Sequence, residues 1–131
     1  MDEHCDLLFV YGTLLDEKNE FAAYLKGNST FLQKGRFKGR LYDLGEYPGA
    51  VFRPANQEYV YGSIYMMNKP EKILKILDDY EGIGEIEEQP DLFVRELIEI
   101  ETETQPAKCW VYFYNLPIDN LKQIVSGRYL Q

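Results

Sequence analysis

Near the N-terminus an apolar run passes directly into a glycine turn, Leu7-Leu8-Phe9-Val10-Tyr11-Gly12-Thr13-Leu14. A short apolar run that ends at glycine is typical of a strand buried on both faces. Residues 16–26 then have the apolar spacing of a helix, which Gly27 could end in a left-handed conformation. Between them, the backbone N–H groups of residues 12–14 would face outward and suit a carboxylate or a developing oxyanion. A tight turn without a ligand is the alternative, and the local pattern alone favours it.

Further along the chain, apolar and polar residues alternate in a way that predicts four more strands, over residues 30–42, 58–67, 92–100 and 108–114. The first of these strands would carry a solvated basic face, formed by Lys34, Arg36, Lys38 and Arg40. The sequence Gly45-Glu46-Tyr47-Pro48-Gly49 has the composition of a turn.

A second helix is predicted to begin after Asn68, which can cap it, with Pro70 in its first turn. It should fray near residues 79–81, and a third, short helix is predicted near residues 119–125, ended by Gly127. The pattern as a whole indicates a mixed fold of about six strands with short helices and mainly hairpin-like pairing.

The length and the charge of the chain restrict its class. A chain of 131 residues indicates one domain, residues 1–131. Its net charge of −8 argues against nucleic acid or an anionic membrane as a partner, and residues 78–103 alone hold 11 acidic side chains against one basic side chain. No long apolar run or signal-like N-terminus is present, so we expect a cytoplasmic protein in which Cys5 and Cys109 are reduced, although their pairing stays open.

The sequence lacks the residues that several kinds of catalytic site require. The single histidine, His4, lies beside the N-terminus, and no phosphate-binding glycine loop or spaced set of metal ligands is visible. An enzyme with this sequence would therefore work with carboxylates, tyrosines and backbone amides.

Two further segments have the composition of a site. In Leu77-Asp78-Asp79-Tyr80-Glu81-Gly82, mutual repulsion and a helix C-terminus would both raise the pKa of a carboxylate, as proton transfer near neutral pH requires. A solvated acidic helix end is the more common meaning of such a run. The second segment is rich in tyrosines, which can line a pocket or belong to the core: Tyr42, Tyr47, Tyr59, Tyr61 and Tyr65.

Taken together, these segments resemble the gamma-glutamylcyclotransferase-like family, which includes the gamma-glutamylamine cyclotransferases and the AIG2-like proteins. The resemblance follows the order of the chain and rests on residues 8–14, Gly39 and Tyr42, residues 47–49, 60–65, 77–82, Arg95, residues 111–114, and Ser126-Gly127. It implies an α+β fold, a small mixed β-barrel with flanking short helices. It also implies intramolecular aminolysis of a small-molecule γ-glutamyl amine or peptide, which releases 5-oxoproline without cofactor or metal.

The resemblance assigns roles to particular residues. Glu81 matches the catalytic glutamate, as base toward the attacking amine and then as acid toward the leaving amine. The turn formed by Tyr11, Gly12, Thr13 and Leu14 would hold the substrate. The remaining substrate-binding residues are expected to be Tyr47, Pro48, Gly49 and Tyr114.

The sequence also departs from the family pattern. Phe93 stands where many relatives have an aromatic hydroxyl, and residues 84–91 form an acidic insertion. These departures support an alternative, a non-catalytic binding or interaction domain that keeps the same cavity. Arg95 could contact a substrate carboxylate or pair with a nearby acid, and the ion pair is favoured. A site for an anionic partner on the basic face of residues 34–40 is a weaker possibility.

Overall fold

The computed structural model describes residues 5–12, 20–44, 48–80 and 93–129. Within these ranges the chain forms nine helices and strands, in the order β1 (Leu7–Val10), α1 (Glu20–Gly27), β2 (Ser29–Asp43), β3 (Pro48–Phe52), β4 (Tyr59–Met67), α2 (Pro70–Tyr80), β5 (Phe93–Ile100), β6 (Ala107–Tyr114) and β7 (Lys122–Ile124). Neither described helix is long and apolar enough to span a membrane.

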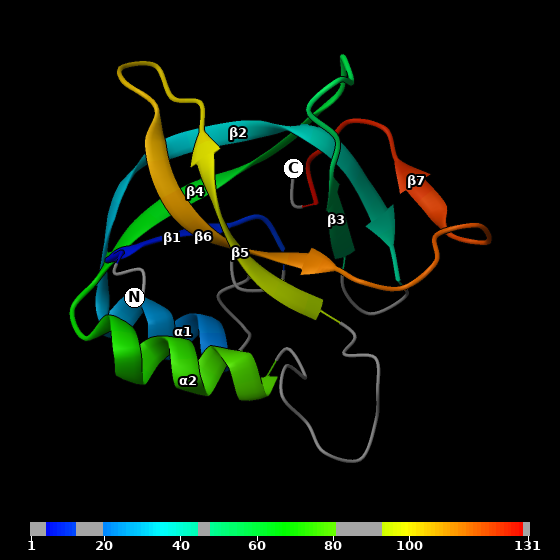
Figure 1. Ribbon diagram of the computed structural model, residues 1–131. Helices are drawn as coiled ribbons and strands as arrows, with labels where there is room; N and C mark the ends of the chain where they lie inside the picture. The colour runs from blue at the N-terminus through cyan, green and yellow to red at the C-terminus, as the bar shows by residue number, and fades with distance from the viewer. Residues whose placement is uncertain (1–4, 13–19, 45–47, 81–92, 130–131) are drawn as a thin grey trace.

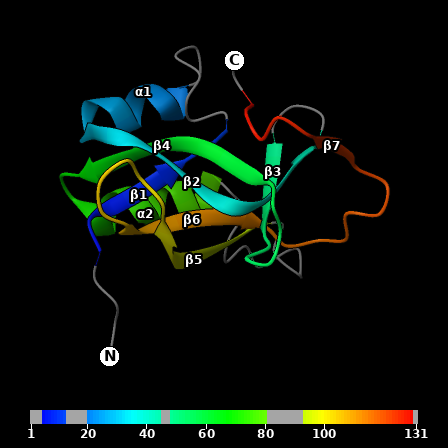
Figure 2. The ribbon, with the colours of Figure 1, turned by 90° about the horizontal axis from the view of Figure 1, so that it is seen from above.

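The strands form one curled mixed sheet in the order β3-β2-β4-β1-β6-β5, with β7 paired to β2 (Figure 1). Strand β1 runs parallel to β6, whereas the other pairs are antiparallel. The long strand β2 pairs with β4 over its first part and with β3 and β7 over its last part. Seen from above, β3 and β7 lie together at one end of the sheet (Figure 2).

The curl brings β2 back to the end of β5. Arg36 and Glu101 form a bridge in which each backbone N–H donates to the carbonyl of the other, at 3.0 and 2.9 Å. Beside this bridge the strands are so close that a Cβ atom on Gly35 would lie 2.6 Å from Cγ2 of Ile100. The sheet therefore curls into a half-barrel in which this bridge joins β2 to the end of β5, and the expected α+β barrel class is confirmed.

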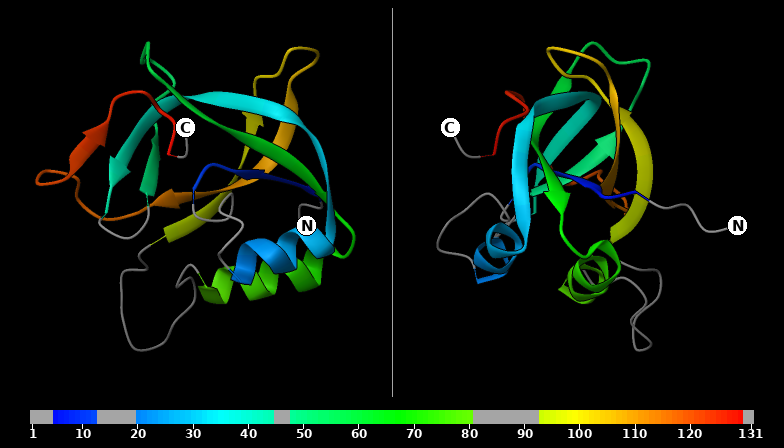
Figure 3. Two further views of the ribbon diagram at one scale, coloured as in Figure 1. Left: turned by 180° about the vertical axis from the view of Figure 1, so that it is seen from behind. Right: turned by 90° about the vertical axis from the view of Figure 1, so that its left-hand side faces the viewer.

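Strand β1 is the centre of the fold because both of its faces are buried. Leu8 and Val10 pack toward the helices, in a cluster that includes Leu25 of α1 and Leu77 of α2. The alternate residues of β1 face the inside of the curl, in a second cluster that includes Phe37 and Phe113. Figure 3 shows α1 and α2 on the same side of the sheet, where they cover the first cluster. This arrangement confirms the prediction drawn from the opening apolar run.

The structure corrects three local predictions. Residues 119–125 do not form a helix, because β7 occupies Lys122–Ile124. The expected turn at residues 45–49 passes at Pro48 into β3, a strand that the sequence did not indicate. Gly27 is the last residue of α1 but has no positive φ, whereas Gly127 has a φ of 72°. Both missed strands are short, and their pairing with β2 rather than their own composition makes them strands.

Candidate active site

The end of β1 is fixed by the hydroxyl group of Tyr11. This side chain is 6% exposed, and its hydroxyl donates a hydrogen bond to the carbonyl oxygen of Tyr112 in β6. The same hydroxyl accepts a hydrogen bond from the backbone N–H of Ala50 in β3, at 3.1 Å. Tyr11 therefore joins three strands, and its one O–H donor is used within the protein.

Gly12 and Gly49 allow three chain segments to meet beside Tyr11. A Cβ atom on Gly12 would lie 2.9 Å from Cγ of Pro48, and one on Gly49 would lie 2.9 Å from Cβ of Tyr114. The end of β1, the start of β3 and the end of β6 thus come into contact. Real Cβ atoms do not approach other atoms so closely, so only glycine permits this packing.

The structure therefore brings together five residues that the sequence assigned to one site: Tyr11, Gly12, Pro48, Gly49 and Tyr114. Thr13, Leu14, Tyr47 and the catalytic candidate Glu81 lie outside the described residues. The predicted cavity between the turn after β1 and Glu81 therefore lies partly outside the described ranges too.

Phe93, the departure from the family pattern, lies at this site. Its ring is 3% exposed and meets the ring of Tyr114 edge to face, with centroids 5.9 Å apart. A hydroxyl at this position would stand next to Tyr114. The side chain that packs against Tyr114 at this position is therefore apolar and offers no hydrogen-bond donor.

Arg95 forms the ion pair that the sequence favoured. Its Nε and Nη2 atoms donate to the two carboxylate oxygens of Asp78 at 2.9 and 3.1 Å, and Tyr112 donates its hydroxyl to Asp78 Oδ1 at 2.7 Å. The guanidinium carbon also lies 4.5 Å from the ring centroid of Trp110. Both charged side chains are about a fifth exposed, at 23% and 22%.

This cluster fixes the last turn of α2 against β5 and β6. The partners of Asp78 are Arg95 and Tyr112, which indicates a structural role for its carboxylate at the end of α2. Arg95, held by two hydrogen bonds and an aromatic ring, has little freedom to bind a substrate carboxylate. The sequence did not identify Tyr112 and Trp110 as members of the Arg95–Asp78 cluster. Their alternation with Tyr114 on one face of β6 was the pattern that could have indicated it.

The predicted tyrosines divide between the core and the surface. Tyr42 and Tyr65 are 5% and 8% exposed, so they belong to the core. Tyr59 and Tyr61 are half-buried, and each lies under an arginine: the guanidinium carbons of Arg36 and Arg128 are both 3.9 Å from the respective ring centroids. Tyr61 also lines a pocket on the outer face of β2 and β4.

Neither a metal site nor a cysteine nucleophile is indicated in the described ranges. Among these residues no three His, Cys, Asp or Glu side chains gather as metal ligands would. Both thiols are free, and burial raises the pKa of Cys109 to about 12, with a smaller contribution from Cys5. A thiol with this pKa stays protonated at neutral pH and is a poor nucleophile.

Comparison with known proteins agrees with the fold and with the motifs. The family model described as "Gamma-glutamyl cyclotransferase, AIG2-like" matches residues 8–131. The gamma-glutamylcyclotransferase family protein YtfP of Escherichia coli (strain K12) is 32% identical over 130 residues, which cover 94% of this chain and 95% of that protein.

Solved structures give the same result. The solution structure of YtfP from Escherichia coli has a TM-score of 0.68 and 31% identity, covering 95% of this chain and 96% of that chain. The crystal structure of an AIG2-like protein from Mus musculus has a TM-score of 0.65 at 24% identity, covering 85% of this chain and 78% of that chain, and it supports the fold alone.

Proposed function

Because the chain belongs to the AIG2-like gamma-glutamyl cyclotransferase family, we propose that it releases 5-oxoproline from a γ-glutamyl amine or a γ-glutamyl peptide. One observation carries the proposal beyond family membership. Tyr11, Gly12, Pro48, Gly49 and Tyr114 come from three distant segments and lie together. We place the reaction in the cytoplasm, with a small-molecule γ-glutamyl substrate and with neither nucleic acid nor a membrane as a partner.

The proposed reaction is an intramolecular aminolysis. The α-amine of the γ-glutamyl group attacks its own γ-carbonyl carbon, a new C–N bond closes the five-membered ring, and the original amide C–N bond breaks. The proton lost by the attacking amine is transferred to the leaving amine. Glu81 carries this proton, first as base and then as acid.

Ring closure requires a folded substrate, and the proposed role of the turn after β1 is to hold the substrate in that folded conformation. Backbone N–H groups of Gly12, Thr13 and Leu14 would hold the α-carboxylate or the carbonyl oxygen of the substrate. Holding the amine against the carbonyl supplies much of the acceleration, because the two reacting groups already belong to one molecule. The fixed position of Tyr11 supports such a role, since it anchors the residue before Gly12 to β3 and β6.

The cluster around Asp78 supports different roles for Asp78 and Glu81. Asp78 lies three residues before Glu81 and is neutralised by Arg95. It therefore exerts little repulsion on nearby carboxylates, and it holds the end of α2 from which the chain continues to Glu81. Of these two acids, only Glu81 is proposed to transfer protons.

The test is release of 5-oxoproline from a panel of γ-glutamyl amines and γ-glutamyl peptides. We expect the Glu81→Gln variant to lose about 10²–10⁴-fold in rate, the usual contribution of a general acid–base residue. Glu71→Gln, at the exposed start of α2, is the matched control and should keep the wild-type rate. An undiminished rate in Glu81→Gln would remove Glu81 from the mechanism.

A second candidate function is binding without catalysis, and the observation that favours it is the apolar side chain of Phe93 beside Tyr114. If the wild-type chain binds a γ-glutamyl compound but releases no 5-oxoproline from any member of the panel, the binding domain replaces the enzyme. The Phe93→Tyr variant separates the two functions further, because restoring the hydroxyl should raise the turnover of an enzyme but would leave a binding domain inactive.

A further inference from the structure

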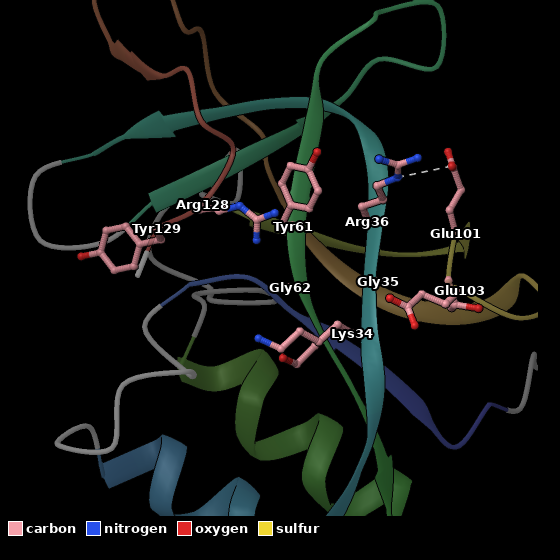
Figure 4. A pocket seen from close by; sticks show the side chains of 11 residues that line it. Lys34, Gly35, Arg36, Tyr61, Gly62, Glu101, Glu103, Arg128 and Tyr129 are labelled. Carbon is pink, nitrogen blue, oxygen red and sulfur yellow. Dashed lines mark ion pairs between the residues drawn. The ribbon is translucent and has the colours of Figure 1, made fainter. Parts of the chain in front are cut away.

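A pocket of about 510 Å³ lies on the outer face of β2 and β4. Its floor comes from β2 and β4, including the paired residues Gly35 and Gly62. One wall is the segment after β7 with Arg128 and Tyr129, and the other is the connection from β5 to β6, residues 101–103 (Figure 4). The volume is within the range of small-molecule sites, about 300–1,000 Å³.

Both walls are fixed by backbone hydrogen bonds, so the pocket is largely formed in advance. On one side, the N–H of Tyr61 donates to the carbonyl of Gly127 at 2.9 Å, and Gly127 has a φ of 72° that favours glycine. On the other side, the reciprocal hydrogen bonds of Arg36 and Glu101 attach the second wall to β2. A preformed site binds its ligand without the entropy cost of ordering the walls.

Both arginines of the pocket lie over aromatic rings. Arg128 lies over Tyr61 and Arg36 lies over Tyr59, each with 3.9 Å between the guanidinium carbon and the ring centroid. A hydrogen bond with Tyr61 raises the pKa of Arg36 above its ordinary value. Arg36 also pairs with Glu101, with 3.5 Å between Nε and Oε1.

The pocket carries charges of both signs, and Arg36 lies beside the two glutamates, paired with Glu101 (Figure 4). Figure 4 shows Arg128 and the end of Lys34 on one side, and Glu101 and Glu103 on the other. A ligand that carries only negative charge would meet the two carboxylates and the overall charge of −8. A ligand with an anionic end and a cationic end meets complementary charge at both sides of the pocket.

We propose that this outer pocket binds a small zwitterion, with a carboxylate held by Lys34 and Arg128 and a protonated amine held by Glu103. The aliphatic part of such a ligand would cross the floor between the two walls. The proposal does not rest on the proposed cyclotransferase reaction, and neither Tyr11 nor Gly12 is among the residues that line the pocket.

The proposal can be tested by NMR titration of the full ¹⁵N-labelled chain with three probes: 6-aminohexanoate, hexanoate and hexylamine. We expect 6-aminohexanoate to shift the backbone amide signals of Gly35, Gly62 and Gly127, and to bind at least fivefold more tightly than either singly charged probe. Equal binding of hexanoate, or shifts confined to Gly12 and Gly49, would overturn the proposal. So would the absence of any shift.

Variants of exposed side chains test the orientation of the ligand. Lys34→Met and Arg128→Gln should each weaken 6-aminohexanoate binding at least threefold. Glu103→Gln should remove the preference for 6-aminohexanoate over hexanoate. Lys38→Met is the matched control, because Lys38 lies on the same face of β2 but outside the pocket, and it should leave binding unchanged. Equal effects of Lys34→Met and Lys38→Met would contradict a specific site.

Discussion

The candidate active site and the outer pocket differ in what holds them together. At the candidate active site, buried groups and strand ends touch, and the Tyr11 hydroxyl bonds to the backbone of Tyr112 and Ala50. At the outer pocket, the backbone closes the walls, and exposed charged side chains point from them. The candidate active site is therefore part of the buried core, whereas the outer pocket lies on the surface of that core. Substitutions at the first should change stability and activity together, and substitutions at the second should change binding alone.

The largest effect is expected at Gly49. In Gly49→Ala the new methyl group would lie 2.9 Å from both Tyr114 Cβ and Leu44 Cδ1, so β3 and β6 must separate. We expect a loss of about 3 kcal/mol in the free energy of unfolding, measured with urea, and a matching loss of 5-oxoproline release. Gly27→Ala is the control, because nothing lies within 4 Å of its Cβ position. If both variants are equally stable, the close contact between the segments is not a requirement of the fold.

The next-largest effect is expected at Arg95. It forms one of two ion pairs that have the same nitrogen–oxygen distance but different exposure to solvent. Arg95–Asp78 and Arg40–Glu58 both have 2.9 Å between nitrogen and oxygen, yet the first pair is 23% and 22% exposed and the second 43% and 35%. Arg95→Met would leave Asp78 partly buried and unpaired, at a cost of about 2 kcal/mol in the free energy of unfolding. Arg40→Met should cost less than about 1 kcal/mol.

A reversed order of these two costs in urea unfolding would mean that Arg95 does not stabilise the end of α2. The rate of 5-oxoproline release adds a second measurement. If the cluster positions Glu81, Arg95→Met should lower the rate under conditions in which the chain is still folded. Arg40→Met should not change the rate.

The sequence predicted the active-site region far better than the outer pocket, for physical reasons. Because β1 is buried on both faces, its residues are nearly all apolar, and the glycine that follows is needed for close packing. The charged residues Lys34, Arg128 and Glu103 can occupy any solvated surface, so their meeting depends on the curl of the sheet. Strand β7 was misassigned for a related reason, since its three residues become a strand only by pairing with β2.

A smaller effect is expected from the hydroxyl group of Tyr11. Tyr11→Phe removes the donor to the Tyr112 carbonyl and the acceptor of the Ala50 N–H, which leaves two buried backbone groups with one bond fewer. We expect a cost of about 1–2 kcal/mol in the free energy of unfolding. Tyr114→Phe, which changes a half-buried wall of the same site, should affect substrate turnover more than stability. The opposite pattern would make Tyr11 the substrate contact and Tyr114 the structural residue.

The smallest effect on stability is expected at the outer pocket, and it decides whether the two regions are independent. Arg128→Gln removes one exposed cation from the face of Tyr61, which should cost less than about 1 kcal/mol in the free energy of unfolding. The rate of 5-oxoproline release should stay at the wild-type value while 6-aminohexanoate binding falls. If the rate of 5-oxoproline release and 6-aminohexanoate binding both fall, the outer pocket and the candidate active site are coupled. The backbone hydrogen bond from Tyr61 to Gly127 would then transmit a change at the surface into the core.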